Sequence, residues 1–337
     1  MRGFEDIIYY TNLKKSVNAA KIVASYYQSR VLSKPKIAGM PISMSIEPTT
    51  ACNLGCSQCP SGLKQFTRPT GNLKPETFNR VMKEVKDTLI YLTLYFQGEP
   101  FINPHFFDFV KTANHHKIFT STSTNAHFLD KKSAEETVKS GLDKLIISVD
   151  GTTQESYEKY RINGDLEKVV EGIENLVEAK KRLRKKNPYI EVQFIVFKHN
   201  EQEIPQIKKM ARSWGVDNLI LKTAQIYDAE QADALIPDNP EYSRYVKNSL
   251  SPTLKINNSF FNHCWRMWHS CVMTWDGDIV PCCFDKDAKY IMGNLSSSSF
   301  KDIWFGEPYQ MFREQLFKKR AEIDICKNCS EGTKVWI

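Results

Sequence analysis

Two patterns of hydrophobic and polar residues alternate over the first two-thirds of the chain. Short apolar runs, typical of buried strands, are separated by longer stretches whose apolar residues recur every three or four positions, as on one face of a helix. The expected strands lie at residues 42–47, 90–96, 118–124, 144–150, 190–197 and 218–226. The expected helices between them lie near residues 75–87, 104–116, 130–140, 165–186 and 201–214.

This strand–helix alternation predicts the fold class. Strands that alternate with helices form right-handed crossover units and a parallel sheet. Six such units predict an α/β protein built on a partial (β/α)6 TIM-like barrel. In barrels of this kind the chemistry lies at the carboxyl ends of the strands. Polar motifs directly after the expected strands are therefore the first candidates for a functional site.

The two ends of the chain depart from this alternation. Residues 5–31 carry an apolar stripe among lysines, which predicts a helix covering the barrel rather than a partner-docking or membrane-surface helix. Residues 227–262 show little periodicity and carry three prolines, as in a linker. A hairpin signal at Asp276-Gly277 and a helix-like stretch at residues 300–318 follow. The expected domains are a helical extension at 1–41, a barrel at 42–226, a linker at 227–262 and a Cys-rich module at 263–337.

Composition narrows the class of protein only slightly. The chain has 337 residues, 41% of them hydrophobic, and a formal net charge of +7. No apolar run is long enough to span a membrane, and the N-terminus lacks a secretory signal, so a cytoplasmic protein is expected. The basic run at residues 180–186 precedes Asn187-Pro188 and predicts a solvated helix end rather than a nucleic-acid site.

The nine cysteines are the composition feature most informative about function, because they are grouped along the chain. Grouped thiols in a cytoplasmic chain indicate metal binding rather than disulfides. Cys52, Cys56 and Cys59 follow the first expected strand at a spacing that lets one loop present three thiolates to one metal cluster. Three ligands leave one iron of a [4Fe–4S] cluster open for a substrate or cofactor. A zinc site, or a loop of reduced thiols, is the alternative.

The Cys-x3-Cys-x2-Cys loop after a strand resembles the signature of the radical S-adenosylmethionine (SAM) superfamily. That resemblance implies a [4Fe–4S] cluster whose open iron binds SAM, and reductive cleavage of SAM to a 5′-deoxyadenosyl radical. Gln58 stands where the family commonly has an aromatic residue, and this departure removes no ligand.

Motifs after three further expected strands extend the resemblance. Gln97-Gly98-Glu99-Pro100 is similar to the family's GGEP motif, which holds the SAM amino group. Thr124-Asn125 resembles a Thr-Asn-Gly strand end, and Ser148-Val149-Asp150-Gly151 resembles a Ser-x-Asp-Gly strand end. Arg161 resembles an arginine that forks onto the SAM carboxylate. A solvated turn, a helix cap and a surface ion pair are the alternatives. The residues that the resemblance assigns to SAM are Gly98, Glu99, Pro100, Thr124, Asn125, Ser148, Asp150 and Arg161.

The C-terminal cysteines resemble a second family module. The Asp-Gly hairpin ending in Pro-Cys, the Gly-Asn-Leu segment and the closing Cys-x2-Cys are similar to the short SPASM or twitch module, which binds an auxiliary [4Fe–4S] cluster. Zinc is the alternative metal. Cys283 competes with its neighbour Cys282, and Cys271 is expected as a buried thiol in the hairpin. The expected ligands of the auxiliary cluster are Cys264, Cys282, Cys326 and Cys329.

Together the two resemblances imply a radical SAM oxidoreductase. The substrate would be a small molecule or a peptide, the reductant an external flavodoxin or ferredoxin, and the auxiliary cluster the acceptor of the electron left after hydrogen abstraction. An epimerase, a peptide-modifying maturase and a non-catalytic metal-stabilised scaffold are the alternatives. The sequence identifies no substrate and no catalytic side chain beyond the cofactor ligands, and it implies neither a nucleic-acid partner nor a membrane span.

Overall fold

The computed structural model describes residues 8–226, 232–246, 255–256 and 261–332. Its main feature is one nine-stranded sheet in the order β11-β10-β9-β1-β2-β3-β4-β5-β6, which is not closed between β6 and β11. The strands are β1 (Ser43–Ile46), β2 (Tyr91–Thr93), β3 (Phe119–Thr124), β4 (Lys144–Ser148), β5 (Tyr189–Val196), β6 (Asn218–Thr223), β9 (Ser270–Met273), β10 (Asp278–Val280) and β11 (Gly293–Asn294).

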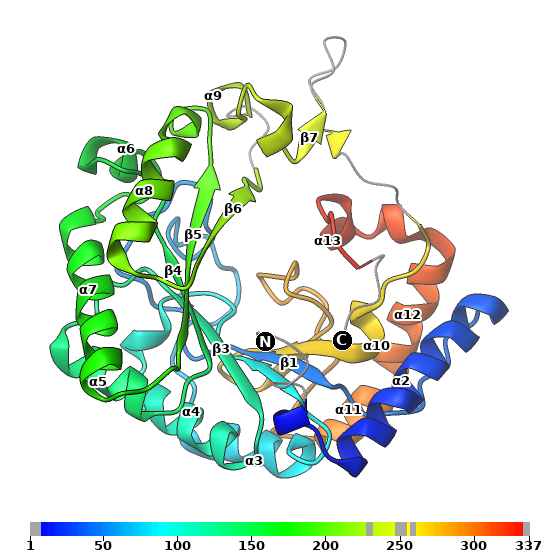
Figure 1. Ribbon diagram of the computed structural model, residues 1–337. Helices are drawn as coiled ribbons and strands as arrows, with labels where there is room; N and C mark the ends of the chain where they lie inside the picture. The colour runs from blue at the N-terminus through cyan, green and yellow to red at the C-terminus, as the bar shows by residue number, and fades with distance from the viewer. Residues whose placement is uncertain (1–7, 227–231, 247–254, 257–260, 333–337) are drawn as a thin grey trace.

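Strands β1 to β6 are parallel, each paired with the next along the chain. The crossover helices cover the outer side of the curved sheet (Figure 1). They are α3 (Pro75–Val85), α4 (Phe106–His115), α5 (Lys131–Lys139), α6 (Gln154–Tyr160), α7 (Leu166–Arg182) and α8 (Ile204–Trp214). Asp130, Thr153 and Asp165 cap three of them by accepting backbone N–H bonds, which fixes where those helices begin. The predicted partial (β/α)6 barrel is confirmed.

The expected strands are all present, although most are shorter than the apolar runs. Helix α6 was not expected, because its seven residues contain too few apolar positions to show a period. The hydroxyl-rich β3 is almost wholly buried. Three of its hydroxyls have partners within the protein: Thr120 donates to Asp143 at 3.2 Å, Thr122 to the Leu94 carbonyl at 2.7 Å and Thr124 to Glu99 at 2.8 Å.

The region predicted as a linker contains short elements. They are α9 (Ala232–Leu235), a 3-10 turn η4 (Pro240–Tyr242) and a two-stranded ribbon of β7 (Tyr245–Val246) and β8 (Lys255–Ile256). Residues 227–231, 247–254 and 257–260 of that predicted linker lie outside the described residues, as do 1–7 of the N-terminal extension and 333–337 of the Cys-rich module. The four domain boundaries stay a prediction.

The C-terminal part joins the barrel sheet directly. The predicted hairpin is present as β9 and β10, and β9 pairs in parallel with β1, placing Cys271 opposite Met44. The expected single helix at 300–318 is instead two helices, α11 (Phe300–Phe305) and α12 (Glu307–Lys319), which divide at Gly306 and Pro308. Three short elements lie next to the C-terminal cysteines. They are the helices α10 (Arg266–His269) and α13 (Asp324–Lys327) and the 3-10 turn η5 (Arg320–Glu322).

A buried ion pair links the barrel to this C-terminal part. Arg68 makes a bidentate bond to Glu47, at 2.8 and 2.6 Å, just beyond the end of β1. The Trp275 backbone N–H donates to the same carboxylate at 3.2 Å, and the Arg68 Nε donates to the Lys286 carbonyl at 3.1 Å. Burial raises the pKa of Glu47, and Arg68 opposes that shift. The pair therefore holds together three segments that lie apart in the sequence.

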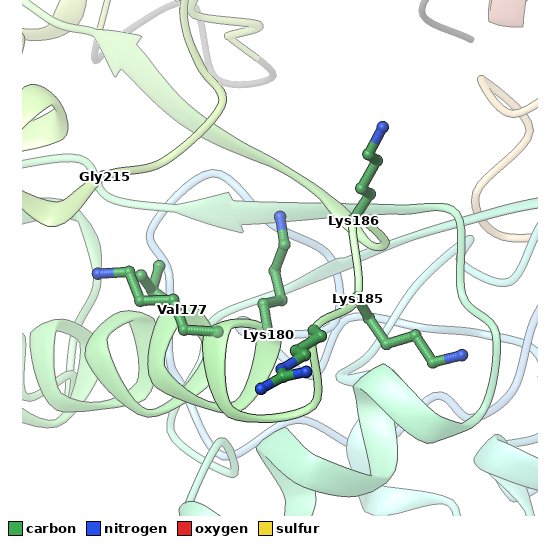
Figure 2. Close-up of a pocket in the computed structure, with 7 residues that line it drawn as sticks. Val177, Lys180, Lys185, Lys186 and Gly215 are labelled. Atoms are coloured by element: carbon green, nitrogen blue, oxygen red, sulfur yellow. The ribbon is translucent and has the colours of Figure 1, made fainter.

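The basic run predicted as a solvated helix end lies at the end of α7. Figure 2 shows that the labelled side chains Lys180, Lys185 and Lys186 do not converge on one point. Lys180 binds Asp217 at 3.0 Å, and Arg182 pairs with Glu135 on α5. Cations at a helix C-terminus favour its dipole.

None of the described helices combines the length and the apolar character that crossing a bilayer requires.

We predict that Arg68→Met lowers the free energy of unfolding by about 3–5 kcal/mol, because it leaves the Glu47 carboxylate buried without its cation. The loss should be larger near pH 8 than near pH 5.5. Without Arg68 the folded-state pKa of Glu47 rises further above its unfolded value, so stability is lost as pH rises through that folded pKa. Anaerobic urea denaturation at the two pH values measures both effects.

Arg80→Met, on the exposed side of α3, is the matched control and should change stability by less than about 0.5 kcal/mol. Equal losses for the two variants would contradict the structural role of the pair.

Candidate functional site: a three-cysteine pocket and a second thiol group

The cysteine loop after β1 is held in shape by backbone hydrogen bonds. The Gly55 N–H donates to the Ile162 carbonyl at 2.9 Å, and the Cys59 N–H donates to the Cys56 carbonyl at 3.1 Å. Cys56 is buried, whereas Cys52 and Cys59 are half-buried. The loop therefore leans on the turn after α6 and presents its three thiols on one side.

Those thiols line one pocket together with the ends of β2, β3 and β4. The lining residues that the sequence singled out are Cys52, Cys56, Cys59, Gly98, Glu99, Thr124, Asn125, Ser148 and Arg161. Two other predicted residues are not in the lining: Pro100, which is buried and begins the 3-10 turn η1 (Pro100–Ile102), and Asp150, which lies behind Arg161.

Glu99 is held rigidly at the pocket wall. Its carboxylate accepts from the Asn125 backbone N–H at 2.7 Å, the Thr124 hydroxyl at 2.8 Å and the Phe101 backbone N–H at 3.3 Å. Burial raises the pKa of Glu99 to about 7, and these donors oppose the rise. A cationic group brought into the pocket would favour the ionised carboxylate. Asn125 also donates to Asn53 at 2.8 Å, linking this wall to the cysteine loop.

Arg161 connects the cysteine loop to β4 and β5. Its Nε donates to Asp150 at 2.7 Å, its Nη2 lies 2.6 Å from the same carboxylate, and its Nη1 lies 3.6 Å from the Cys56 sulfur. Asp150 is fully buried and accepts from the Ile195 N–H at 2.6 Å. Asp150 thus positions the guanidinium, and the guanidinium places positive charge beside a cysteine sulfur.

Three pocket residues have no signal in the sequence. Ser61 accepts from the Gly98 N–H at 3.0 Å, and Gly62 lies so close to Cys56 that a Cβ there would be 2.5 Å from the Cys56 nitrogen. Tyr95 lines the pocket after β2, and burial of its hydroxyl raises its pKa. The residue as a whole is about one-third exposed. Ser61 and Gly62 follow Cys59 by two and three residues, and this closeness in sequence is the one feature that associates them with the cysteine loop.

The donor set fits a cluster with an open iron. Burial raises the pKa of Cys52 to about 12, and it raises that of Cys56 as well, so these thiols stay neutral until a metal ion displaces their protons. No three histidine, cysteine or carboxylate side chains among the described residues lie close enough together to hold a single metal ion. A cluster, by contrast, takes each thiolate on a different iron. Glu99 presents a hydrogen-bond acceptor, and Ser148 and Arg161 present donors, to the same pocket.

A second group of thiols gathers in the C-terminal part. Cys264, Cys326 and Cys329 interact electrostatically with one another and with Arg320. The Arg320 Nη2 lies 3.6 Å from the Cys329 sulfur and donates to the Glu331 carbonyl at 2.7 Å. Burial raises the pKa of all three thiols. Their donor chemistry fits a second cluster held next to a buried cation.

Cys282 and Cys283 differ in their surroundings. Cys282 packs against the main core and interacts electrostatically with Cys264, whereas Cys283 packs in a separate cluster with Phe96 and Val280. A hydrogen bond between the two thiols, together with Arg266, lowers the pKa of Cys283. These surroundings favour Cys282 as the fourth ligand, which stays a prediction. Cys271 is buried on β9, as expected.

Gly332 is a further residue that the sequence did not single out. It has a φ of +85°, and a Cβ there would lie 2.4 Å from the Cys264 sulfur. Its carbonyl accepts from the Trp265 N–H at 2.7 Å. The segment after Cys329 therefore closes over Cys264.

We predict that Gly98→Ala disrupts the pocket and that Gly55→Ala does not. Gly98 has a φ of +72°, and a Cβ there would lie 2.4 Å from the Thr49 carbonyl oxygen, so the turn that carries Glu99 must move. A Cβ on Gly55, inside the cysteine loop, meets nothing closer than 3.6 Å. Thermal unfolding and bound iron measure the difference. We expect Gly98→Ala to cost more than about 1 kcal/mol and Gly55→Ala to match the wild type in both readouts. Identical behaviour of the two variants would contradict the packing described for Gly98.

The comparisons with known proteins agree with this geometry. The family model of the radical SAM superfamily matches residues 46–211, and that of an iron–sulfur cluster-binding domain, SPASM, matches residues 264–330. The tungsten-containing aldehyde ferredoxin oxidoreductase cofactor-modifying protein of Pyrococcus furiosus is 25% identical over 315 residues, which cover 85% of this chain and 86% of that protein. The mycofactocin maturase MftC of Mycobacterium ulcerans is 23% identical over 309 residues, 86% of this chain and 80% of that one.

A solved structure shows the same fold. Streptococcus suis SuiB bound to S-adenosylmethionine superposes with a TM-score of 0.63 at 17% identity, covering 94% of this chain and 77% of SuiB. The two family models imply SAM, a [4Fe–4S] cluster and auxiliary iron–sulfur binding. The chain belongs to the radical SAM superfamily and carries a C-terminal SPASM domain.

Proposed function

We propose that this protein is a radical SAM enzyme that carries out a net two-electron oxidation of a small-molecule or peptide substrate. The observation that carries the proposal is the presence of two separate thiol groups, one open to a pocket and one enclosed by buried side chains. When bound, the first cluster and SAM supply a 5′-deoxyadenosyl radical that abstracts hydrogen from the substrate. Four thiolates around a second cluster would leave it no open iron, which would suit that cluster to accept an electron.

The pocket residues have separate roles in this proposal. Cys52, Cys56 and Cys59 hold the first cluster, and the fixed carboxylate of Glu99 accepts hydrogen bonds from the SAM ammonium. Thr124 and Asn125 keep that carboxylate in place.

Arg161 keeps donors available for the SAM carboxylate. Three of its five N–H groups point at Asp150 and Cys56, which leaves two. Ser148 lines the same side of the pocket and can add a hydroxyl donor. Asp150 and Pro100 act indirectly, by positioning Arg161 and the turn that carries Glu99.

The second thiol group has the surroundings of an electron acceptor. Cys264, Cys282, Cys326 and Cys329 are its proposed ligands. Buried Arg320 lies against Cys329, and Arg266 interacts with Cys282 and Cys283. Positive charge and hydrogen bonds near the sulfurs favour the reduced state of a cluster. An external flavodoxin- or ferredoxin-type protein would supply the electron that starts the reaction.

The proposed substrate class follows from the names of the relatives. One relative is named a PqqA peptide cyclase, and another is named an S-adenosyl-L-methionine-dependent 2-deoxy-scyllo-inosamine dehydrogenase, so both a peptide and a small molecule are candidate substrates. An epimerase would need a hydrogen-donating side chain near the substrate. Cys271 is too deeply buried to serve, and Cys283 is the better-placed candidate.

Electron paramagnetic resonance of the dithionite-reduced protein, with and without SAM, tests the proposal. We expect SAM to change one cluster signal and leave the other unchanged, because only the first cluster has an open iron. The Cys326→Ala/Cys329→Ala variant should lose the unchanged signal and still form 5′-deoxyadenosine. The Cys52→Ala/Cys56→Ala/Cys59→Ala variant should lose the SAM-sensitive signal and form none. A second signal that also responds to SAM would mean that the auxiliary cluster binds a ligand, and its acceptor role would be wrong.

A further inference from the structure

The N-terminal helix exposes an ordered apolar stripe. Helix α2 (Leu13–Leu32) presents Leu13, Val17, Ala20, Ala24, Tyr27 and Val31 to solvent. We call these six residues the α2 seam. Leu13 and Val31, at its two ends, are 80% and 84% exposed. Isolated apolar residues are common on protein surfaces, but a continuous stripe along one helix is a sign of an interaction site.

The exposure is not caused by loose attachment of the helix. The opposite face of α2 is anchored by Ile22 and Tyr26, both fully buried. Asn18 donates to the Met40 carbonyl at 2.7 Å, and Ser29 donates to the Lys36 carbonyl at 2.9 Å. The helix runs along the outer edge of the molecule beside α10 and α12 (Figure 1). Its outward stripe is therefore fixed in place.

The spacing of the seam matches a coiled-coil interface. Successive members are separated by 4, 3, 4, 3 and 4 residues, which is the a/d spacing of a heptad repeat. At 1.5 Å per residue the seam extends about 27 Å, enough to contact a helix of about 20 residues. The two alanines at its centre let a partner helix approach closely.

The charges beside the seam are of one sign. Lys14 and Lys21 take heptad position e, Arg30 takes position g, and α2 contains no acidic residue. Arg30 also lies over the Tyr27 ring, at 6.0 Å from its centre. Lys14 has an exposed contact with Asp87 at 3.7 Å, which is worth little in water. Residues at e and g decide which helices pair, so acidic residues are required there in the partner.

We propose that the α2 seam binds an amphipathic helix of another protein that carries Glu or Asp beside its apolar stripe. A second copy of this chain is disfavoured, because pairing two α2 helices would bring Lys14, Lys21 and Arg30 of both copies together. An anionic bilayer is disfavoured as well. Membrane-surface helices insert bulky residues, whereas Ala20 and Ala24 add almost no apolar surface at the centre of this stripe.

Fluorescence anisotropy with two designed peptides tests the proposal on the full-length, cluster-loaded protein. Both peptides have three heptads with Leu at a and d. One carries Glu at e and g, the other Lys. We expect the Glu peptide to bind at least tenfold more tightly than the Lys peptide, with an affinity that falls as salt is added.

Variants of exposed residues provide the controls. Val17→Glu and Tyr27→Glu should weaken binding of the Glu peptide at least tenfold, and Met311→Glu, on an exposed apolar side chain of α12, should leave it unchanged. The charge-reversed variant Lys14→Glu/Lys21→Glu/Arg30→Glu should prefer the Lys peptide. The proposal is overturned if the two peptides bind equally or not at all. It is also overturned if the protein dimerises through Val17 in sedimentation, or if it binds phosphatidylglycerol vesicles through Val17.

Discussion

The bond between Glu47 and Arg68 is the contact on which the arrangement of both thiol groups depends. Glu47 stands between β1 and the loop of Cys52, Cys56 and Cys59. Arg68 lies beyond that loop, and Trp275 belongs to the turn between β9 and β10. A buried carboxylate is costly unless a cation and hydrogen bonds satisfy it, so the three segments are held to one arrangement. Glu47 therefore fixes the chain just before the cysteine loop, and Arg68 fixes the chain after it.

Strand β1 extends this constraint to the whole sheet. It pairs with β2 on one side and β9 on the other, so the barrel and the SPASM hairpin share one set of backbone hydrogen bonds. The cysteine loop follows β1, and Cys264 and Cys282 flank the β9–β10 hairpin, so parts of both thiol groups adjoin neighbouring strands of one sheet. The β1–β9 pairing therefore joins the barrel and the C-terminal hairpin through backbone hydrogen bonds.

The parts of the fold and site that were predictable are those encoded by local patterns. The alternating periods located all six barrel strands, and the spacing of Cys52, Cys56 and Cys59 with the turn at Gly98 marked the pocket. The missing parts depend on contacts between distant residues. Nothing around Ser270–Met273 indicates that β9 pairs with β1, and no local pattern shows that Arg320 is fully buried against Cys329. Likewise, the motif around Asp150 does not show that its carboxylate bonds to Arg161.

The central claim is that this chain holds two iron–sulfur clusters at separate sites. The most direct test is the iron and sulfide content after anaerobic reconstitution of the wild type and of the variant in which Cys52, Cys56 and Cys59 are all alanine. Two [4Fe–4S] clusters predict about eight irons per chain in the wild type and about four in the variant. About four irons in the wild type and none in the variant would mean that the C-terminal thiols hold no cluster, and a redox-neutral reaction would then replace the proposed oxidation.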